Sequence, residues 1–543
     1  MTRSHRQPQA QPQAQPQPPG PAPARPHGTA LGRLPAVPRP SRRTRRTALA
    51  LAAATLTAAT ATSTATAATA PTAPAAPTTN TSPSATTPPI IAITQTSTNT
   101  SLTTTSLGLS FEAEDLTLPA FTSGNLAAYL KTLGTSVIRI GGNTVDETFW
   151  TSTNQTPPSW SLATITPADL TALSTLTKAS GWKVILGVNL KQYNPTAAAD
   201  EAAHAAAALG SSLQAIEIGN EPDLYSQYEN NTKQYFTDFK AYVAAINKAA
   251  PGVPIEGSDA GGAPDSSFQS AFVTNEQSLS APDISELTSH YYPLSACSSG
   301  DDPTIPDLLG TSTRDAESDI ALDAVARAAK INVPAVIDES NSVVCEGEQG
   351  VSNVFASALW EIDDQLVLAR DGVTGDYMHG TVIQCNGAKP LYMYYTPLCA
   401  PTAAAATAGD LAAQPEYYGL AAVHEIGTGT FLNLTNPAWA TVRGYAVKHT
   451  NGTMTVVLDD VQDPTSNGST TVTLDLGANF TSGTRINLTA ASLTATSGIT
   501  LGGQSVSSNG TLPTPTTTPV TVSGNTLNVT VPAGSAALIT LAP

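Results

Sequence analysis

Residues 213–223 read Leu-Gln-Ala-Ile-Glu-Ile-Gly-Asn-Glu-Pro-Asp, an apolar run that ends in a polar turn. The apolar part has the length of a buried β-strand, and Gly219 and Pro222 mark its end. A helical pattern follows at 232–249, which Asn231 or Thr232 can cap. A strand, a turn that carries polar side chains and a helix therefore form one unit.

This unit recurs along the chain, because apolar runs and helical patterns alternate from residue 106 onward. The predicted strands are 107–112, 136–141, 183–190, 213–219, 254–258, 286–291, 334–338 and 375–379. Predicted helices include 167–180, opened by Thr166 and Pro167, as well as 232–249, 314–330 and 352–370. The alternation indicates a parallel sheet, and eight units predict an α/β fold, a closed (β/α)8 TIM barrel. No glycine-rich phosphate loop follows any of these strands, which argues against a nucleotide-binding fold.

Beyond about residue 430 the pattern changes to Thr/Val alternation broken by Asn-Gly and Ser-Gly turns. We therefore expect a barrel over residues 89–429 and a C-terminal antiparallel β-sandwich over 430–543. Residues 89–105 are also β-like, and they can add a strand to the β domain.

The N-terminal segment has the order of an export signal. Arginines end at Arg46, an apolar Ala/Leu/Thr run follows, and small residues come next, so we assign 1–67 as an export signal region. Residues 68–88 are rich in Pro, Thr and Ala and predict a disordered linker. The apolar run is shorter than the roughly 20 residues of a membrane span. We expect a secreted, extracellular protein without a membrane span.

The charge of the chain bears on nucleic-acid binding, and its cysteines bear on disulfides and metal binding. Nine of the 25 basic residues lie in the first 46 positions, which leaves 16 basic and 42 acidic side chains in the remainder. With this excess of acidic side chains, the chain after residue 46 should repel nucleic acid. An even number of cysteines in an exported chain favours disulfides. Three pairings are possible; closeness in sequence favours Cys385 with Cys399, which leaves Cys297 with Cys345. The cysteine and histidine spacing does not suit a structural zinc site, and we expect no metal.

In a TIM barrel, functional groups gather at the carboxyl ends of the strands. The polar residues that follow the predicted strands include Glu112, Asn143, Asn220, Glu221, Tyr291, Glu339 and His379. Retaining glycoside hydrolysis needs two carboxyl groups about 5–5.5 Å apart, one as proton donor and one as nucleophile. One of the two must keep its proton, which the nearby charge of the other favours. We predict Glu221 as acid/base and Glu339 as nucleophile, with Asn220 on the sugar 2-hydroxyl. Asp338 should point away from Glu339 by strand alternation.

Five segments in order resemble glycoside hydrolase family 79, the β-glucuronidase and heparanase-like family of the retaining (β/α)8 clan. They are 110–112, 138–143, 217–223, 289–292 and 339–342. The resemblance implies net retention on a β-linked glucuronic acid without a metal or organic cofactor. It also implies that Glu112 and Asn143 contact sugar hydroxyls, that Tyr291 orients the nucleophile, and that His379 lines the pocket. Tyr417 or Tyr418 would lie there too, and Arg139 with Asp146 is expected to form an ion pair below it.

One departure concerns the loop after the seventh strand, which in this family grips the substrate carboxylate with tyrosines and backbone amides. Here residues 343–348 read Val-Val-Cys-Glu-Gly-Glu, so Gly347 is the remaining candidate donor and the sugar preference is open. The expected cations at the barrel mouth are Lys191, Arg314 and Lys389. This small number of cations favours a terminal glucuronide, on a small molecule or a glycan, over an internal site in a polyanion.

The function expected from the sequence is an exo-acting β-glucuronidase, a monomer. Two alternatives stay open: a related β-glycosidase acting on a neutral xyloside or glucoside, and a carbohydrate-binding protein without catalysis. An adhesin built on the β-sandwich is a weaker third, because that segment shows no aromatic cluster for sugar stacking.

Overall fold

The computed structural model describes residues 87–228, 231–262, 266–385 and 393–543. The predicted export region, residues 68–86 of the predicted linker and Lys389 lie outside the described residues. Within the described part, no helix combines the length and the apolar character that a membrane crossing requires.

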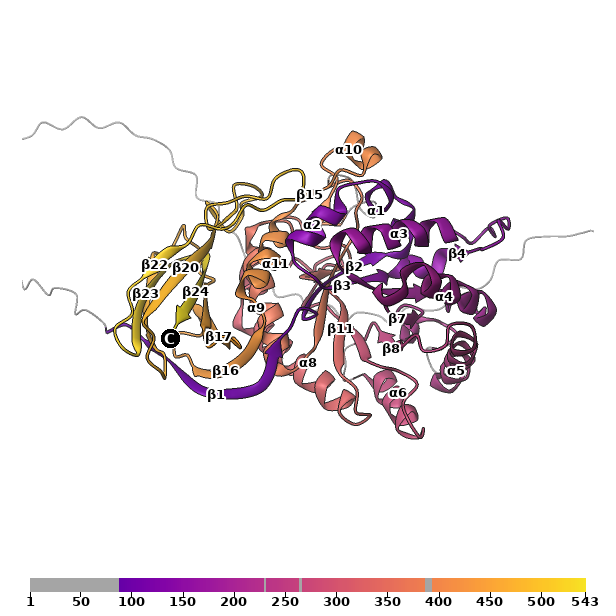
Figure 1. The fold of residues 1–543 in the computed structure, drawn as a ribbon, viewed down its shortest axis with the longest axis horizontal. Coiled ribbons are helices and arrows are strands. Elements are labelled where there is room, and N and C mark those ends of the chain that lie inside the picture. The colour runs from indigo at the N-terminus through magenta and orange to yellow at the C-terminus, as the bar shows by residue number, and fades with distance from the viewer. Residues whose placement is uncertain (1–86, 229–230, 263–265, 386–392) are drawn as a thin grey trace, which may run out of the picture. The chain divides into compact units, whose positions relative to one another are not determined.

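Eight parallel strands close into a barrel, which confirms the predicted fold class (Figure 1). The barrel strands are β2 (Leu107–Glu112), β3 (Val137–Gly141), β6 (Lys183–Val188), β7 (Leu213–Ile218), β8 (Ile255–Ala260), β9 (Leu287–Tyr291), β11 (Ala335–Ser340) and β13 (Gly375–Gly380). They pair in chain order, and β13 closes the ring by pairing with β2. Each strand begins within one residue of its predicted start, because the apolar runs that define them are short and sharply bounded.

Helices cover the outside of the barrel. The longer ones are α2 (Leu126–Thr132), α3 (Pro167–Ser180), α4 (Pro195–Leu209), α5 (Thr232–Ala249), α6 (Ser267–Gln277), α8 (Thr311–Ala328), α9 (Phe355–Asp371) and α11 (Pro415–Ile426). Helix α3 starts with a capping box between Thr166 and Asp169. Asn231 caps α5 by accepting from the backbone N–H of Gln234. These caps fix where the helices begin, as the sequence predicted.

Short elements lie at the strand ends. The helices among them are α1 (Pro119–Thr122), α7 (Ile305–Leu308) and α10 (Ala403–Ala408). The strands are β4 (Thr148–Trp150), β5 (Ala163–Ile165), β10 (Leu294–Ser295), β12 (Val343–Val344), β14 (Leu398–Cys399) and β15 (Ala412–Ala413). They pair as β4 with β5, β10 with β12 and β14 with β15.

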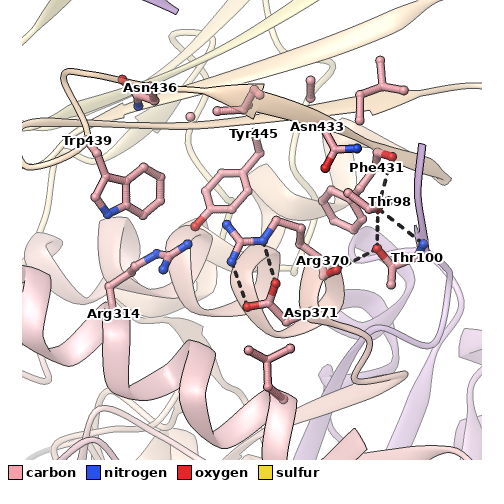
Figure 2. A pocket seen from close by; sticks show the side chains of 15 residues that line it. Thr98, Thr100, Arg314, Arg370, Asp371, Phe431, Asn433, Asn436, Trp439 and Tyr445 are labelled. Atoms are coloured by element: carbon pink, nitrogen blue, oxygen red, sulfur yellow. Dashed lines mark hydrogen bonds and ion pairs between the residues drawn. The ribbon is translucent and has the colours of Figure 1, made fainter. Parts of the chain in front are cut away.

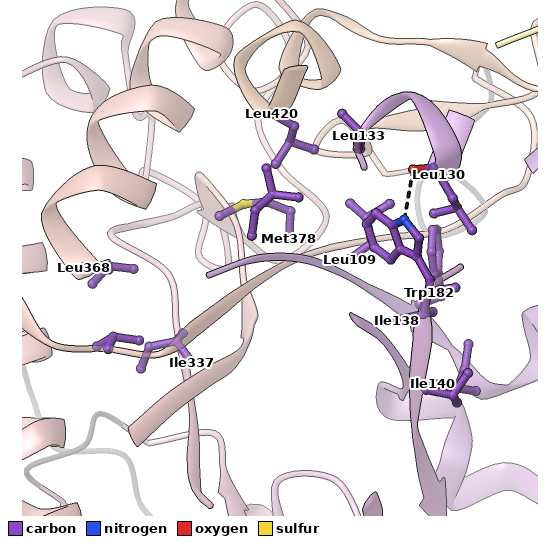
Figure 3. Packing of buried hydrophobic residues seen from close by; sticks show 14 of the residues in the cluster. Leu109, Leu130, Leu133, Ile138, Ile140, Trp182, Ile337, Leu368, Met378 and Leu420 are labelled. Atoms are coloured by element: carbon purple, nitrogen blue, oxygen red, sulfur yellow. Dashed lines mark hydrogen bonds between the residues drawn. The ribbon is translucent and has the colours of Figure 1, made fainter. Parts of the chain in front are cut away.

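The core of the barrel lies between strands and surrounding helices (Figure 3). Ile138 is fully buried on β3, and Trp182 packs beside it with 1% of its surface exposed. The indole N–H of Trp182 donates to the carbonyl of Leu130 at 2.9 Å, so this polar group is satisfied inside an apolar layer.

The second part of the chain is one ten-stranded sheet. Its strands are β1 (Ile90–Leu102), β16 (Gly429–Thr435), β17 (Val442–Lys448), β18 (Met454–Asp460), β19 (Ser469–Asp475), β20 (Ser482–Thr489), β21 (Thr500–Leu501), β22 (Thr518–Val520), β23 (Thr526–Pro532) and β24 (Ser535–Ala542). Strand β1 pairs antiparallel with β16 and parallel with β19, so the segment before the barrel belongs to this sheet.

This sheet makes its own core by doubling over, so that its two halves pack face to face as the predicted β-sandwich requires. Val472 of β19 and Val529 of β23 share a buried cluster with Val456 of β18 and Ile539 of β24. Strand twist accumulates over many strands, and a long open sheet commonly curls onto itself. The antiparallel β domain predicted from the sequence is therefore present, with continuous pairing.

Helices α9 and α11 lie between the barrel and the β sheet (Figure 1). Fifteen consecutive residues of α9, 355–369, are buried. Arg443 of β17 donates to the Asp363 carboxylate on α9, which also accepts from the Tyr445 hydroxyl. The two parts thus share a buried polar contact as well as apolar packing.

Candidate active site

Glu221 and Glu339 meet at the carboxyl ends of the barrel strands. Glu221 directly follows the turn after β7, and Glu339 lies near the end of β11. One carboxylate oxygen of each lies within 4.8 Å of the other. The side chain of Glu221 is 20% exposed and that of Glu339 is 6% exposed. This spacing is that of a retaining pair, and both groups can be reached from the barrel mouth.

The backbone around Glu221 is unusual. Gly219 has φ +90° and Glu221 itself has φ 49°, a left-handed conformation that is rare for a residue with a side chain. The Glu221 N–H donates to the carbonyl of Asp259 at 2.9 Å, which holds this turn against β8. A Cβ on Gly261 would lie 2.5 Å from the Glu221 carboxyl, so the glycine at this position leaves space for that side chain.

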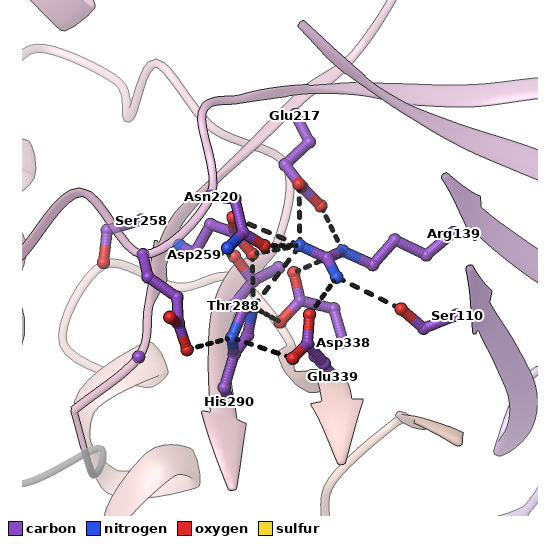
Figure 4. Close-up of polar contacts among 12 residues, drawn as sticks. Ser110, Arg139, Glu217, Asn220, Ser258, Asp259, Thr288, His290, Asp338 and Glu339 are labelled. Atoms are coloured by element: carbon purple, nitrogen blue, oxygen red, sulfur yellow. Dashed lines mark hydrogen bonds and ion pairs between the residues drawn. The ribbon is translucent and has the colours of Figure 1, made fainter. Parts of the chain in front are cut away.

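Arg139, fully buried on β3, holds several acceptors at once (Figure 4). Its guanidinium donates to Glu217 Oε2 at 2.7 Å, to Glu339 Oε2 at 2.7 Å and to Asp259 Oδ1 at 3.0 Å. It also donates to Asn220 Oδ1 at 2.9 Å. A planar guanidinium with five N–H donors is suited to such a hub.

The predicted ion pair between Arg139 and Asp146 is therefore wrong. Asp146 instead lies 3.4 Å from the ammonium of Lys191 and accepts from the Tyr225 hydroxyl. The alternation of β3 points Arg139 into the barrel, where the carboxylates of other strands outcompete a loop residue that follows its own strand.

His290 connects Glu221 to the buried acids. Its Nδ1 lies 3.0 Å from Glu221 Oε1, and its Nε2 lies 2.8 Å from Asp259 Oδ1. Burial favours the neutral imidazole, but the charges of Glu339 and Asp259 outweigh it and raise the pKa of His290 well above its usual value. The imidazolium can donate through Nδ1 to Glu221 Oε1 and through Nε2 to Asp259 Oδ1. Sequence reasoning placed His290 at a strand end but gave it no role.

The charge of Glu339 is set by its basic neighbours. Burial alone would raise the pKa of Glu339, but the charges of His379, His290 and Arg139 hold that pKa well below its usual value. Glu339 is therefore ionised over the whole physiological range, as a nucleophile must be.

The tyrosine beside Glu339 is Tyr292, which corrects the assignment of Tyr291. The Tyr292 hydroxyl donates to Glu339 Oε1 at 2.9 Å. Burial raises the pKa of Tyr291, and so do the charges of Glu317 and Asp364, which belong to helices α8 and α9. Tyr291 thus faces the helix layer, and its neighbour past the end of β9 faces the barrel axis.

Asp338 also departs from the expected alternation. Its carboxylate lies 4.0 Å from Arg139 Nε and 4.0 Å from His290 Nε2, on the same side as Glu339. The register between β9 and β11 shifts between Ile337 and Glu339. A bulge of this kind turns two consecutive side chains toward one face, a feature that a period of two cannot predict.

The other predicted site residues surround this pair. His379 Nδ1 lies 3.0 Å from the Ser110 hydroxyl and 3.8 Å from Glu339 Oε2, and its Nε2 lies 3.4 Å from Glu112 Oε1. Asn143 is exposed, with its Oδ1 3.5 Å from the amide nitrogen of Asn220. The structure therefore brings Glu112, Asn143 and His379 to the same strand ends.

Other predicted lining residues lie elsewhere. The N–H of Gly347 donates to the Val343 carbonyl at 3.1 Å, so it is not free to bind a substrate carboxylate. Tyr417 donates to a backbone carbonyl of Tyr129, and Tyr418 accepts from the N–H of Val506 in the β domain. Arg314 belongs to helix α8, and its guanidinium lies over the ring of Trp439 in the β domain.

Tyr395 was missed from sequence. Its ring lies 5.6 Å from that of Tyr292 and 6.3 Å from that of His379. It comes from the long loop after β13, and no local pattern distinguishes it from its neighbour Tyr394 there. The aromatic walls beside Glu339 thus come from the loops after β9 and β13.

The disulfides follow the pairing favoured from sequence. Cys297 is bonded to Cys345, and Cys385 to Cys399. The first bond joins the loops after β9 and β11, beside the parallel pairing of β10 with β12. These loops carry Tyr292 and follow Glu339, so the bond braces the site.

Three groups of acidic and histidine side chains have the spacing of metal ligands among the described residues. They are Glu221–His290–Glu339, Asp259–His290–Asp338 and Glu217–Glu256–Asp338. Glu217, Asp259 and Glu339 already contact the Arg139 guanidinium. A further cation would be repelled by Arg139 and by the imidazolium of His290.

Comparison with known proteins agrees with this architecture. No curated protein matches the chain. A 4-O-α-L-rhamnosyl-β-D-glucuronidase from Fusarium oxysporum, solved with Rha-GlcA, has a similar structure with a TM-score of 0.67 at 21% identity, covering 83% of this chain and 100% of that one. The α-L-arabinofuranosidase AbfB of Bifidobacterium longum gives 0.59 at 14% identity, covering 84% and 100%. The α-L-arabinofuranosidase of Thermotoga maritima has a TM-score of 0.57 at 12% identity, covering 83% of this chain and 99% of that one.

These structural likenesses concern the fold. The sequence itself matches the model of the glycosyl hydrolase family 79 C-terminal beta domain over residues 444–538. The match lies within the β domain, and it agrees with the resemblance to family 79 that the barrel motifs indicated.

Proposed function

We propose that this chain is a secreted, exo-acting β-glucuronidase that works with net retention. The observation that carries the proposal is the approach of Glu221 and Glu339 to within 4.8 Å, with Glu339 held as the anion. Glu339 being the ionised member, Glu221 is left as the proton donor.

In the first step Glu221 protonates the glycosidic oxygen while a Glu339 oxygen attacks the anomeric carbon. The carbon–oxygen bond to the aglycone breaks, and a glycosyl ester of Glu339 forms. In the second step Glu221 takes a proton from water, whose oxygen attacks the same carbon and releases Glu339. Two inversions give net retention, and each residue returns to its starting protonation state.

Support for a glucuronide comes from the family match and from the Rha-GlcA complex of the structurally similar fungal enzyme. Tyr292 and Tyr395 place hydroxyl-bearing rings on the side of Glu339, although the loop after β11 lacks tyrosine. Lys191 at the mouth pairs with Asp146 at 3.4 Å, so its charge is partly neutralised, which favours a terminal sugar over a polyanion. The two disulfides suit an oxidising compartment and so support secretion.

One observation favours a neutral sugar instead. The N–H of Gly347 is already bonded within its loop, so the expected backbone donor for a carboxylate is occupied. A β-xylosidase or β-glucosidase is therefore the second candidate, with the same two catalytic carboxyls.

The test compares para-nitrophenyl β-glucuronide with the matching glucoside and xyloside. We expect the glucuronide to have the highest kcat/KM, with β-glucuronate seen first by proton NMR. A preference for the xyloside or glucoside would replace the first candidate by the second, and an α-anomer as first product would exclude retention.

The two carboxyls are tested separately. Glu221→Gln should lower kcat by about 100-fold or more, with the greatest loss for poor leaving groups, and Glu339→Gln should abolish turnover of every substrate. Glu147→Gln, at an exposed acid near the mouth, is the matched control and should keep wild-type rates. Full activity of the Glu221 and Glu339 variants would reject this site.

A further inference from the structure

A second cavity of about 550 Å³ lies where helices α8 and α9 meet strands β1, β16 and β17 (Figure 2). Its walls include Arg314, Arg370, Phe431, Asn433, Trp439 and Tyr445. It shares no lining residue with the carboxyl pair, and its size suits a small-molecule ligand.

Arg314 is the chemically distinctive group of this cavity. Its side chain is only 9% exposed, and its guanidinium lies 4.1 Å from the centre of the Trp439 ring. Its Nε is buried without a hydrogen-bond partner among the described residues. The acid beside it, Asp315, is 66% exposed and 3.6 Å from Nη1, so it is a weak partner. A buried donor left unsatisfied is costly, and a ligand oxygen would satisfy it.

The other arginine is already neutralised. Arg370 donates two bonds of 2.8 Å to Asp371, which also accepts from the Ser318 hydroxyl. The positive charge of the cavity is therefore mainly that of Arg314, whose ion-pair partner Asp315 is exposed, in a chain whose net charge is −17. A guanidinium with free N–H groups binds a carboxylate with good geometry.

The remaining walls suit a sugar ring. Trp439 is a partly exposed aromatic wall, Phe431 and Tyr445 are each only 1% exposed, and Leu322 adds an apolar side chain that is 53% exposed. The exposed amide of Asn433 can bond to hydroxyl groups. A uronic acid combines these needs, because it has one carboxylate, several hydroxyls and apolar C–H faces.

We propose that this cavity is a second, non-catalytic site for uronic acid residues, with Arg314 binding the carboxylate. Binding here would hold an acidic glycan on the enzyme while its free end enters the barrel. The site does not depend on the reaction proposed above, since none of its residues touches the catalytic pair.

The experiment uses the full-length protein labelled with 5-fluorotryptophan. Trp439→Phe assigns the fluorine signal of Trp439, and D-glucuronate, D-glucose and inorganic phosphate are the probes. We expect glucuronate to shift the Trp439 signal saturably, with no shift from glucose. A missing response to glucuronate, an equal response to glucose, or a phosphate response of the same strength would overturn the proposal.

Arg314→Gln should weaken glucuronate binding at Trp439 at least tenfold and leave kcat on a small aryl glycoside unchanged. Arg327→Gln is the matched control, because Arg327 lies on the same helix but pairs with Asp323 outside the cavity. Glucuronate binding unchanged in Arg314→Gln would reject the assigned role. Should this variant unfold, the wild-type comparison of glucuronate with glucose still decides. If glucuronate bound at Trp439 but the protein hydrolysed no glucuronide, the proposed function would be rejected and the second site would stand.

Discussion

Three basic side chains surround the Glu339 carboxylate: Arg139, His290 and His379. Arg139 supplies a direct bond of 2.7 Å, and the two histidines lie 3.8 Å away. Tyr292 adds a neutral donor on the other carboxylate oxygen. With one oxygen bonded to Arg139 and the other to Tyr292, the carboxylate is held in a single orientation.

Tyr292→Phe tests that orientation. A hydrogen bond to a charged group is worth about 1.5–3 kcal/mol, so we expect kcat to fall roughly 10- to 100-fold. The fold and the KM should change little, because the phenyl ring keeps its packing. Steady-state kinetics with thermal melting of the same sample measure both effects.

Tyr291→Phe is the matched control for this change, since it removes the same hydroxyl from the adjacent residue. Its kcat should stay within about twofold of wild type, because Tyr291 faces the helix layer. The opposite ranking of the two variants would contradict the geometry and restore the assignment made from sequence.

Which residues a sequence can place depends on local regularity. Glu221 and Glu339 were found because each ends an apolar run in a barrel. Tyr291 and Asp338 were misplaced because the chain leaves regular alternation at the end of β9 and at the bulge of β11. Arg139 was recognised, but the acids that it contacts come from three other strands, β7, β8 and β11, and local patterns do not show which side chains meet across a barrel.

At the scale of elements, the loops after β9 and β11 act together. The pairing of β10 with β12 and the bond between Cys297 and Cys345 join them side by side. One loop carries Tyr292 and the other follows Glu339, so their separation sets the hydrogen bond between these residues. Rigidity in these loops therefore matters for catalysis as well as for stability.

The variant Cys297→Ala/Cys345→Ala should be less stable and less active than wild type. The bond closes 48 residues, and loop-closure entropy for that length corresponds to about 4 kcal/mol. We expect a lower urea midpoint and a lower kcat, measured without reductant. Wild-type kcat in a destabilised protein would show that the loops hold the site without the bond.

Element boundaries were predictable where side-chain pattern and end signals agree. The eight barrel strands and the caps of α3 and α5 are examples. The doubling over of the β sheet could not be predicted, because alternation shows which face of a strand is buried but not which strand lies opposite. The parallel pairing of β1 with β19 joins segments nearly 400 residues apart, beyond the reach of any local signal.

Across the whole molecule, acidic side chains are buried in the helix layer as well as at the strand ends. Glu201 on α4, Glu317 on α8 and Glu416 on α11 each lie inside the helix layer. Burial is the main cause that raises the pKa of each of them to about 8. For Glu416 a hydrogen bond from Asn341 offsets part of the effect. These carboxyls therefore stay protonated in the folded chain at neutral pH.

Stability should consequently fall as the pH rises from about 5 to 8. An unfolded Glu ionises near pH 4.5, so between that pH and about 8 the folded state binds protons that the unfolded state has released. Each such group contributes a slope of up to about 1.4 kcal/mol per pH unit. Glu339 acts in the opposite sense, since its lowered pKa removes stability as the pH falls through the acid range.

Urea unfolding at pH 5, 6, 7 and 8 measures the slope of the unfolding free energy with pH, which should be shallower in Glu201→Gln and unchanged in Glu147→Gln. A free energy of unfolding that rises from pH 5 to 8 would mean that these carboxyls are ionised inside the fold.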